Sequence, residues 1–172
     1  MTGRSSWGFG MGKVYIGQTR KTGKGIFAES FIKKGDPIFI WKGRLVIQSY
    51  SPTGAKVGQR WLGMGRNLWL KSDKSNPGYY INHSCRPNAG FRGSVTVVAM
   101  RDIKKGKEIT IDYSMTEEDP WWRMQCQCGQ RSCRKLIRSI QFLPRNVFER
   151  YRSFMKPFFV KSYEKSGKDR YA

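Results

Sequence analysis

Four cysteines and a single histidine are the side chains of this 172-residue chain best suited to metal chemistry. Cys126, Cys128 and Cys133 form a Cys-x-Cys-x4-Cys run on a glycine-containing loop, where close thiolates suit a tetrahedral zinc ion. The fourth ligand is then Cys85, because the chain has no other cysteine and its histidine lies two residues before Cys85. The spacing therefore predicts one zinc site built from all four cysteines.

Four thiolates would close the coordination shell of this zinc ion and leave no position for water. The metal is therefore expected to be structural, which excludes metal-assisted hydrolysis as the main chemistry of the site. Two other interpretations of the cysteines stay open. One is four reduced structural thiols, and the other is an iron–sulfur cluster, although such clusters usually have other cysteine spacings.

Two further stretches, residues 80–88 and 108–113, combine residue types that suit binding rather than a plain core. The first contains Asn82-His83-Ser84-Cys85 followed by Arg-Pro-Asn, a run that satisfies neither a helix nor a sheet ladder well. The second alternates apolar residues as a strand does and ends at Tyr113. We predict that the two stretches meet in space. His83 also has a simpler interpretation, a hydrogen-bonded structural histidine.

The elements that must position these residues are mostly short strands. Alternating or apolar runs bounded by turn residues predict strands at residues 14–16, 37–41, 45–47, 94–100 and 108–113. Residues 61–65 and 67–70 predict a hairpin, and residues 22–28 predict a turn whose two glycines permit close approach to a ligand. Little amphipathic helix precedes residue 140, so the fold class is mostly β with few short helices.

The C-terminal region has a different pattern. Val147, Phe148, Tyr151, Phe154 and Met155 recur at helical spacing, which predicts one helix that packs an aromatic stripe on the core and ends at a proline, with a charged tail from about residue 161. Its many arginines would also allow contact with nucleic acid. We divide the chain into an N-terminal arm (1–12), a core (13–114), a zinc-binding segment (115–142) and a basic C-terminal helix and tail (143–172).

Charge and hydrophobicity limit the partners and the location. The chain has 33 basic and 12 acidic residues, a net charge of +21, which favours attraction to a polyanion such as nucleic acid; the alternative is a device for solubility. No stretch reaches the ~20 apolar residues of a membrane-spanning helix. We therefore expect an intracellular protein with no membrane partner, which agrees with cysteines used as metal ligands.

Residues 117–119, Glu-Glu-Asp, are the only acidic run in this basic chain and follow Tyr113 by four residues. Two tryptophans come directly after the run and the proline that follows it. We predict an acidic rim that attracts a basic substrate segment. The alternative is a solvated loop that relieves local repulsion.

Four blocks together resemble the SET-domain protein lysine methyltransferases, in that family's order. They are residues 23–28 (Gly-Lys-Gly-Ile-Phe-Ala), residues 80–88, residues 108–113, and the cysteine run with Arg134. The resemblance covers roughly residues 14–137, and the second and fourth blocks are the most specific. The short length resembles the compact stand-alone members of prokaryotes and viruses, which carry a post-SET zinc loop.

The resemblance implies a fold of small curved sheets, β-clip-like, with a knot-like crossing of the Asn-His-Ser segment and the loop before the last strand. It implies that S-adenosylmethionine is the methyl donor and that Tyr113 is catalytic. The target lysine would enter from the opposite face through a narrow channel. The implied cofactor-binding residues are Lys24, Gly25, Tyr80, Asn82, His83 and, as an apolar lid, Leu136.

Three positions depart from the family pattern. Tyr79 stands where the family often has arginine, so one cofactor contact is changed. Ile111, two residues before Tyr113, stands where phenylalanine or tyrosine is common and influences product multiplicity, so the number of methyl groups stays open. Leu136 stands where the family often has an aromatic residue, and it covers a ligand without stacking.

These observations lead to one function and two alternatives. The expected function is S-adenosylmethionine-dependent methylation of lysine in a protein substrate, a basic chromosomal protein such as a histone or nucleoid protein, by an enzyme that associates with DNA through its charge. The alternatives are a non-catalytic zinc-containing nucleic-acid-binding protein and a methyltransferase for a non-chromosomal protein. A monomer or weak dimer is expected.

Overall fold

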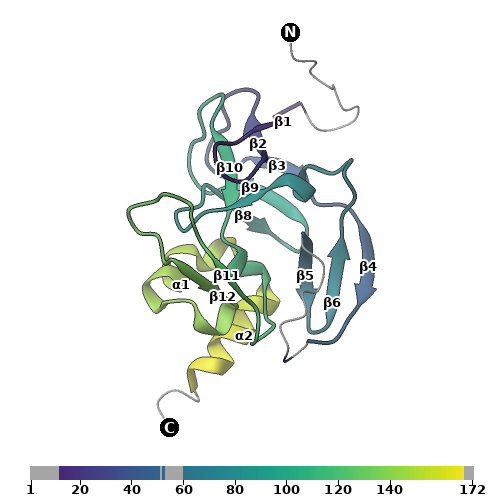
Figure 1. Cartoon of the computed structure of the whole chain (residues 1–172), viewed down its shortest axis with the longest axis vertical. Coiled ribbons are helices and arrows are strands. Elements are labelled where there is room, and N and C mark those ends of the chain that lie inside the picture. Colours follow the sequence, from purple (N-terminus) through teal and green to yellow (C-terminus); the bar gives the residue numbers. More distant parts are fainter. Residues whose placement is uncertain (1–11, 51, 53–59, 169–172) are drawn as a thin grey trace.

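Short strands in four small sheets make up most of the structured part of the chain (Figure 1). The computed structural model describes residues 12–50, 52 and 60–168. All but the last residue of the predicted N-terminal arm lies outside these residues. The prediction of a mostly β fold is confirmed, because the described helices are two α-helices and four short 3-10 turns.

The first sheet brings the two chemistry-bearing stretches together. Its strand order is β1 (Val14–Gln18), β2 (Lys24–Ala28), β10 (Glu108–Ile111) and β7 (Asn82–His83). Strands β10 and β7 run parallel, with Thr110 opposite Asn82 and Ile111 opposite His83. The two stretches therefore lie side by side, as predicted.

The glycine-containing block at residues 22–28 differs from its prediction. Only Gly23 has the positive φ of a turn, at 76°. Residues from Lys24 onward form strand β2, and the register sets Gly25 opposite Gly17 of β1. The apolar residues Ile26 and Phe27 continue the pattern of the strand, and Ile26 is fully buried. The turn prediction thus holds for the first residues of the block and is wrong for the rest.

Two three-stranded sheets form the remainder of the core. One has the order β3 (Pro37–Ile40), β9 (Thr96–Ala99), β8 (Ala89–Arg92), and the other has the order β4 (Arg44–Ile47), β6 (Leu68–Lys71), β5 (Trp61–Gly65). The predicted hairpin is β5 and β6, whose turn contains Asn67 at a φ of 57°. Apolar residues of these sheets pack on those of the first sheet in one buried cluster that includes Phe39, Phe91 and Ile109.

A small ribbon carries the cysteine run. Strands β11 (Arg123–Gln125) and β12 (Leu136–Arg138) pair antiparallel on either side of that run. Sequence patterning did not predict them, because three residues are too few to establish a period. The four 3-10 turns are η1 (Pro77–Tyr80), η2 (Tyr113–Thr116), η3 (Ile140–Phe142) and η4 (Arg152–Phe154).

The C-terminal region contains two helices where one helix and a tail were predicted. Helix α1 spans Arg145–Tyr151, and helix α2 spans Pro157–Lys168. Pro157 is the first residue of α2, a position where its missing N–H costs nothing. Phe148 of α1 stacks on Tyr163 of α2 at 3.7 Å between ring centroids, so α2 packs on the domain instead of forming a charged tail. No described helix combines the length and apolar character that a membrane crossing requires.

Candidate functional site

Tyr113 lies where strand β10 ends and its hydroxyl points back toward the Asn-His-Ser stretch. The hydroxyl donates a hydrogen bond to the carbonyl oxygen of Ile81 at 2.8 Å. Burial raises the pKa of Tyr113 to about 12, so the phenol is protonated at neutral pH. A buried phenol fixed by a backbone carbonyl has a defined orientation, and its oxygen lone pairs remain able to accept a hydrogen bond.

His83 connects the tyrosine strand to the cysteines. Its Nδ1 accepts the backbone N–H of Tyr113 at 3.2 Å, and its Nε2 lies 3.4 Å from the Sγ of Cys85. The side chain is 4% exposed, and burial lowers the pKa of His83 to about 4, so the imidazole is neutral at pH 7. The side-chain contacts are those of the simpler interpretation, a hydrogen-bonded structural histidine.

Four of the predicted cofactor residues meet around strand β2. Asn82 Nδ2 donates to the carbonyl oxygen of Lys24 at 3.2 Å and to Glu108 Oε1 at 2.8 Å. A Cβ on Gly25 would lie 2.7 Å from Glu108 Oε1 and 2.9 Å from Asn82 Nδ2, so a larger residue here would displace these side-chain ends. Lys24 Nζ lies 5.9 Å from the ring centroid of Tyr80.

Leu136, the predicted lid residue, lies on the ribbon instead of within this group. Its side chain is 43% exposed, and the strand register sets it opposite Gln125. One contact links its loop to the β1–β2 turn, because Lys21 Nζ donates to the carbonyl oxygen of Gln127 at 3.3 Å. The described hydrogen bonds and ring contacts do not join Leu136 to Asn82 or Tyr80.

The four cysteines form one cluster. Their sulfur atoms all lie within 4.8 Å of one another, and Cys85 Sγ is 3.8 Å from Cys126 Sγ. A tetrahedral zinc ion with bonds of ~2.3 Å separates its ligands by about 3.8 Å, so the donor set and its spacing fit zinc. This confirms the predicted proximity of Cys85 to the distant run at Cys126, Cys128 and Cys133.

A buried ion pair that sequence reasoning missed lies beneath this cluster. Arg134 Nη2 is 2.6 Å from Asp112 Oδ1 and 2.7 Å from Oδ2, and Asp112 is fully buried. The backbone N–H of Arg134 also donates to Cys85 Sγ at 3.3 Å. The available signal was their position, since Asp112 precedes the predicted catalytic tyrosine and Arg134 follows the last cysteine.

A cavity of about 560 Å³ opens beside Tyr113. Its inner wall includes Ile81, Ile111 and Tyr113, which links it to the hydroxyl described above. Its other walls come from segments far apart in sequence: the β5 region, the η1 turn and the start of the ribbon. The aromatic and apolar lining residues are Trp41, Trp61, Leu62, Tyr79, Trp122 and Met124. Such walls admit the long apolar part of a side chain and disfavour a charged ammonium.

The acidic run forms neither the predicted acidic rim nor the alternative, a solvated loop. Asp119 is 4% exposed. Glu118 accepts hydrogen bonds from the Tyr50 hydroxyl at 2.7 Å and from Ser162 Oγ at 2.6 Å, which ties helix α2 to the core. Among the residues that the structure describes, Glu117 is the only acidic one that lines the cavity, and it is 9% exposed. The prediction of an acidic rim is therefore wrong, because these carboxyl groups are directed into the fold.

Comparison with known proteins agrees with this architecture. Residues 23–114 match the family model described as SET domain. The chain is 25% identical over 149 residues to Histone-lysine N-methyltransferase 2D of Homo sapiens, covering 77% of this chain and 3% of that protein. It is 30% identical over 138 residues to the H3 lysine-4 specific histone-lysine N-methyltransferase of Schizosaccharomyces pombe, covering 71% and 15%. The chain thus spans a small fraction of the length of these relatives.

The fold itself has solved counterparts. A crystal structure of KRYPTONITE in complex with mCHH DNA, an H3(1-15) peptide and SAH superimposes with a TM-score of 0.56 at 22% identity, over 72% of this chain and 29% of that one. A second KRYPTONITE structure, in complex with mCHG DNA and SAH, gives a TM-score of 0.57 at 20% identity. At this identity the likeness concerns the fold. The family match spans more than half of the chain, and we conclude that the chain belongs to the SET domain family.

Proposed function

We propose that this chain transfers methyl groups from S-adenosylmethionine to the side-chain amine of a lysine in a protein substrate. The observation that carries the proposal is the Tyr113 hydroxyl, held by the Ile81 carbonyl in the lining of a cavity that contains many aromatic and apolar residues. The curated relatives, named as histone-lysine N-methyltransferases, support the reaction class.

The group around strand β2 suits the methyl donor. Because Gly25 has no side chain, Glu108 and Asn82 approach the β2 backbone closely, and Asn82 is already oriented by its two hydrogen bonds. Tyr80 supplies a half-buried ring beside them, and the backbone of His83 borders the same strand pair. S-adenosylmethionine, when bound, supplies an electrophilic methyl group.

The cavity suits the lysine. Its apolar and aromatic walls disfavour the ammonium form and so lower the pKa of an entering amine. Tyr113 orients that amine through the lone pairs of its hydroxyl oxygen. Holding the amine in line with the methyl group contributes on the order of 7–11 kcal/mol in favourable cases. The proton leaves with water, since Glu117, the only carboxyl group among the described residues of the cavity wall, is itself held protonated when burial raises its pKa to about 8.

A zinc ion at the cysteine cluster fits this scheme as a structural centre. The ion would tie Cys85, three residues after Asn82, to the loop that precedes β12. That tie fixes the Asn-His-Ser stretch beside Tyr113. We also propose that residues 13–114 form the catalytic core, residues 115–142 the zinc-binding segment and residues 143–172 a C-terminal support.

The substrate we propose is a chromosomal protein. The net charge of +21 draws the chain to DNA, where such proteins are concentrated. The relatives named as histone methyltransferases support this class of target. Methylation of a non-chromosomal protein is the alternative that the substrate experiment decides.

The test is radiolabelled methyl transfer from S-adenosylmethionine into cell extract by wild type and by Tyr113→Phe. We expect labelled protein with wild type and a loss of about a hundredfold or more with the variant, because the orienting hydroxyl is gone. Equal labelling by both proteins would remove Tyr113 from its role. Cofactor binding without labelling by either would favour the non-catalytic nucleic-acid-binding protein. Identifying the labelled bands decides the substrate class.

A further inference from the structure

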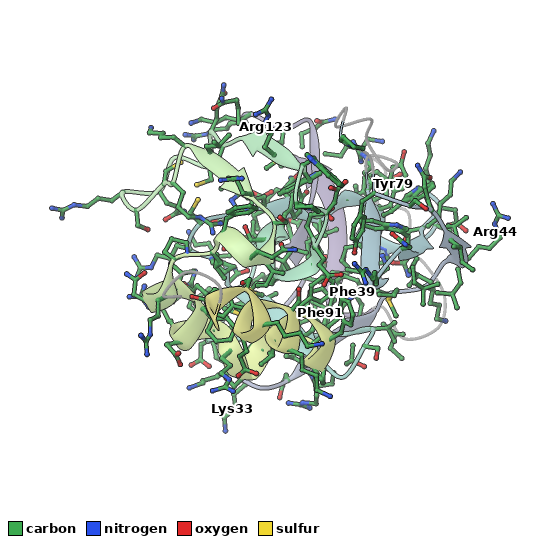
Figure 2. All side chains as sticks on the ribbon, turned by 90° about the horizontal axis from the view of Figure 1, so that it is seen from below. Lys33, Phe39, Arg44, Tyr79, Phe91 and Arg123 are labelled. Carbon is green, nitrogen blue, oxygen red and sulfur yellow. The ribbon has the colours of Figure 1, made fainter. Side chains whose placement is uncertain are left out.

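Two arginines stand at the edge of the proposed substrate cavity. Arg60 and Arg123 both line the cavity and are both exposed. They come from two segments far apart in sequence, since Arg60 precedes β5 and Arg123 begins β11. In Figure 2, Arg123 and Tyr79 lie along the same side of the molecule, while Lys33 lies on the other. The guanidinium group of Arg60 packs on the ring of Tyr79. Two separate segments therefore contribute positive charge to the exposed part of the cavity lining.

Arg123 has a second arginine directly opposite. The β11–β12 register pairs it with Arg138, and paired residues of an antiparallel ribbon project from the same face. Two like charges in that position destabilise the pair unless an anion lies between them. The guanidinium group of Arg138 packs on the ring of Phe142, whose centroid lies 3.3 Å from the guanidinium carbon. Neither arginine forms an ion pair with a carboxylate within the part of the chain that the structure describes.

Arg60 is also held in place without being neutralised. Its Nη1 donates to the carbonyl oxygen of Tyr79 at 3.0 Å, and its guanidinium carbon lies 4.6 Å from the Tyr79 ring centroid. Burial raises the pKa of Tyr113, and the positive charge of Arg60 partly opposes that rise. Arg60 has a φ of 102°, a conformation that non-glycine residues rarely adopt.

Glu117, the one carboxyl group among the lining residues that the structure describes, does not offset these charges. Glu117 Oε1 accepts the backbone N–H groups of Glu118 at 3.0 Å and Asp119 at 2.9 Å, which holds it inside the fold. Burial raises the pKa of Glu117 to about 8, so it is mostly neutral at pH 7. Among the described lining residues, a substrate segment therefore meets the guanidinium groups of Arg60 and Arg123 and a mostly neutral Glu117.

We propose that Arg60, Arg123 and Arg138 form a subsite for acidic side chains, so that the enzyme selects a lysine with aspartate or glutamate beside it. Guanidinium groups match carboxylates in planar, charge-assisted hydrogen bonds, and opposite charges across a rim set specificity more than total affinity. This inference rests on the proposed function, because it takes the cavity as the lysine site. The inference specifies which residues flank the target lysine, and it applies equally to a substrate protein that is basic overall.

The test uses three peptides of equal length that differ only at the two residues flanking one lysine, which are glutamate, glutamine or lysine. Methyl transfer and peptide binding by fluorescence anisotropy are both measured with the zinc-loaded full chain. The rim variant is Arg123→Gln with Arg138→Gln. The control is Lys42→Gln with Arg44→Gln, which removes the same charge from an exposed site at strand β4.

We expect wild type to favour the glutamate peptide over the glutamine peptide by about three- to tenfold in kcat/KM at low salt, with the lysine peptide the poorest. The rim variant should reduce the ratio to below about twofold, while the control retains it. Raising the ionic strength to about 0.5 M should shrink the wild-type ratio as well, because salt screens exposed charges. Arg60→Gln should reduce the ratio in the same direction.

Equal use of the three peptides, or equal ratios in the rim variant and the control, would overturn the inference. A rim variant that loses binding to duplex DNA but keeps the peptide ratio would show a nucleic-acid contact instead, and would also overturn it. The two proposals fail separately. Methyl transfer without a charge preference would contradict the subsite and leave the proposed function intact. Preferential binding of the glutamate peptide, without methyl transfer to any peptide or protein, would contradict the proposed function and leave the subsite intact.

Discussion

Arg134 and Asp112 form a buried ion pair that joins the cysteine loop to the end of strand β10, with Arg134 Nη2 2.6 Å from Asp112 Oδ1. Asp112 is fully buried, and its Oδ1 also accepts the backbone N–H of Ser114 at 3.1 Å. Two segments that each carry predicted site residues are thus held together by one charged contact. Its loss would leave a carboxylate without compensation in the interior.

Arg134→Met is expected to lower the free energy of unfolding by about 3–5 kcal/mol, because it leaves Asp112 buried and unpaired. Urea unfolding of the zinc-loaded protein measures the change. Arg131→Met, at an exposed position of the same loop, is the matched control and should change stability by less than about 0.5 kcal/mol. Adding Asp112→Asn to Arg134→Met should recover part of the loss, and a double variant no more stable than the single would contradict this account.

Metal content tests the cysteine cluster. The purified protein is expected to hold one zinc ion per chain by elemental analysis, and Cys126→Ser should lose it, because three thiolates bind zinc more weakly than four. Ser132→Ala, in the same loop but not in the cluster, should retain the metal. A chelator should lower the thermal midpoint of wild type and leave that of Cys126→Ser unchanged. Iron with visible absorption in place of zinc would contradict the assignment.

Gly25→Ala tests the methyl-donor site. The new methyl group would meet Glu108 Oε1, Asn82 Nδ2 and Thr19 Cγ2 at under 3 Å, so these side-chain ends must move from the ligand-facing surface. We expect the affinity for S-adenosylmethionine, measured by calorimetry, to fall by about tenfold or more, as displacement of positioned groups does.

The control for that variant is Gly167→Ala in helix α2, where a Cβ would have no heavy atom within 4 Å. It should leave cofactor affinity unchanged. A Gly25→Ala protein that binds S-adenosylmethionine as wild type does would show that strand β2 is not part of the donor site.

Lys156 predicts a pH dependence of stability. It is 2% exposed, its Nζ donates to the carbonyl oxygen of Gly63 at 2.5 Å, and burial lowers its pKa to about 7. The folded state therefore binds fewer protons than the unfolded state between pH 7 and about 10.5, so this lysine makes stability rise with pH in that window. Relative to Lys156→Met, wild type should gain about 1.4 kcal/mol per pH unit at most from pH 7 to 9.

Urea unfolding at several pH values gives this difference. Lys161→Met, at an exposed position of helix α2, is the control and should follow the wild-type curve. Comparing wild type with each variant at the same pH removes the contribution of other groups such as Glu117, whose raised pKa makes stability fall between about pH 4.5 and 8. Parallel curves for wild type and Lys156→Met would contradict a neutral buried lysine.

The amino-acid sequence alone determined the features that depend on local spacing. The period-2 runs predicted most core strands, and the Cys-x-Cys-x4-Cys spacing together with the count of cysteines predicted that Cys85 joins the distant loop. The Asn-His-Ser stretch and the strand ending at Tyr113 were also predicted to meet, and β7 and β10 lie in register. Such signals are readable because each depends on residue types a few positions apart.

Only the tertiary structure decided the charges around the cavity. Because Glu117, Glu118 and Asp119 are adjacent in sequence, we predicted that they form one acidic rim, yet in the structure they are directed into the fold. The exposed charged residues of the cavity lining are instead Arg60 and Arg123, sixty-three positions apart. The same holds for the pairing of Asp112 with Arg134 and for the break that divides α1 from α2. Whether a charged group faces solvent, a partner or a cavity depends on long-range packing, and no local period records it.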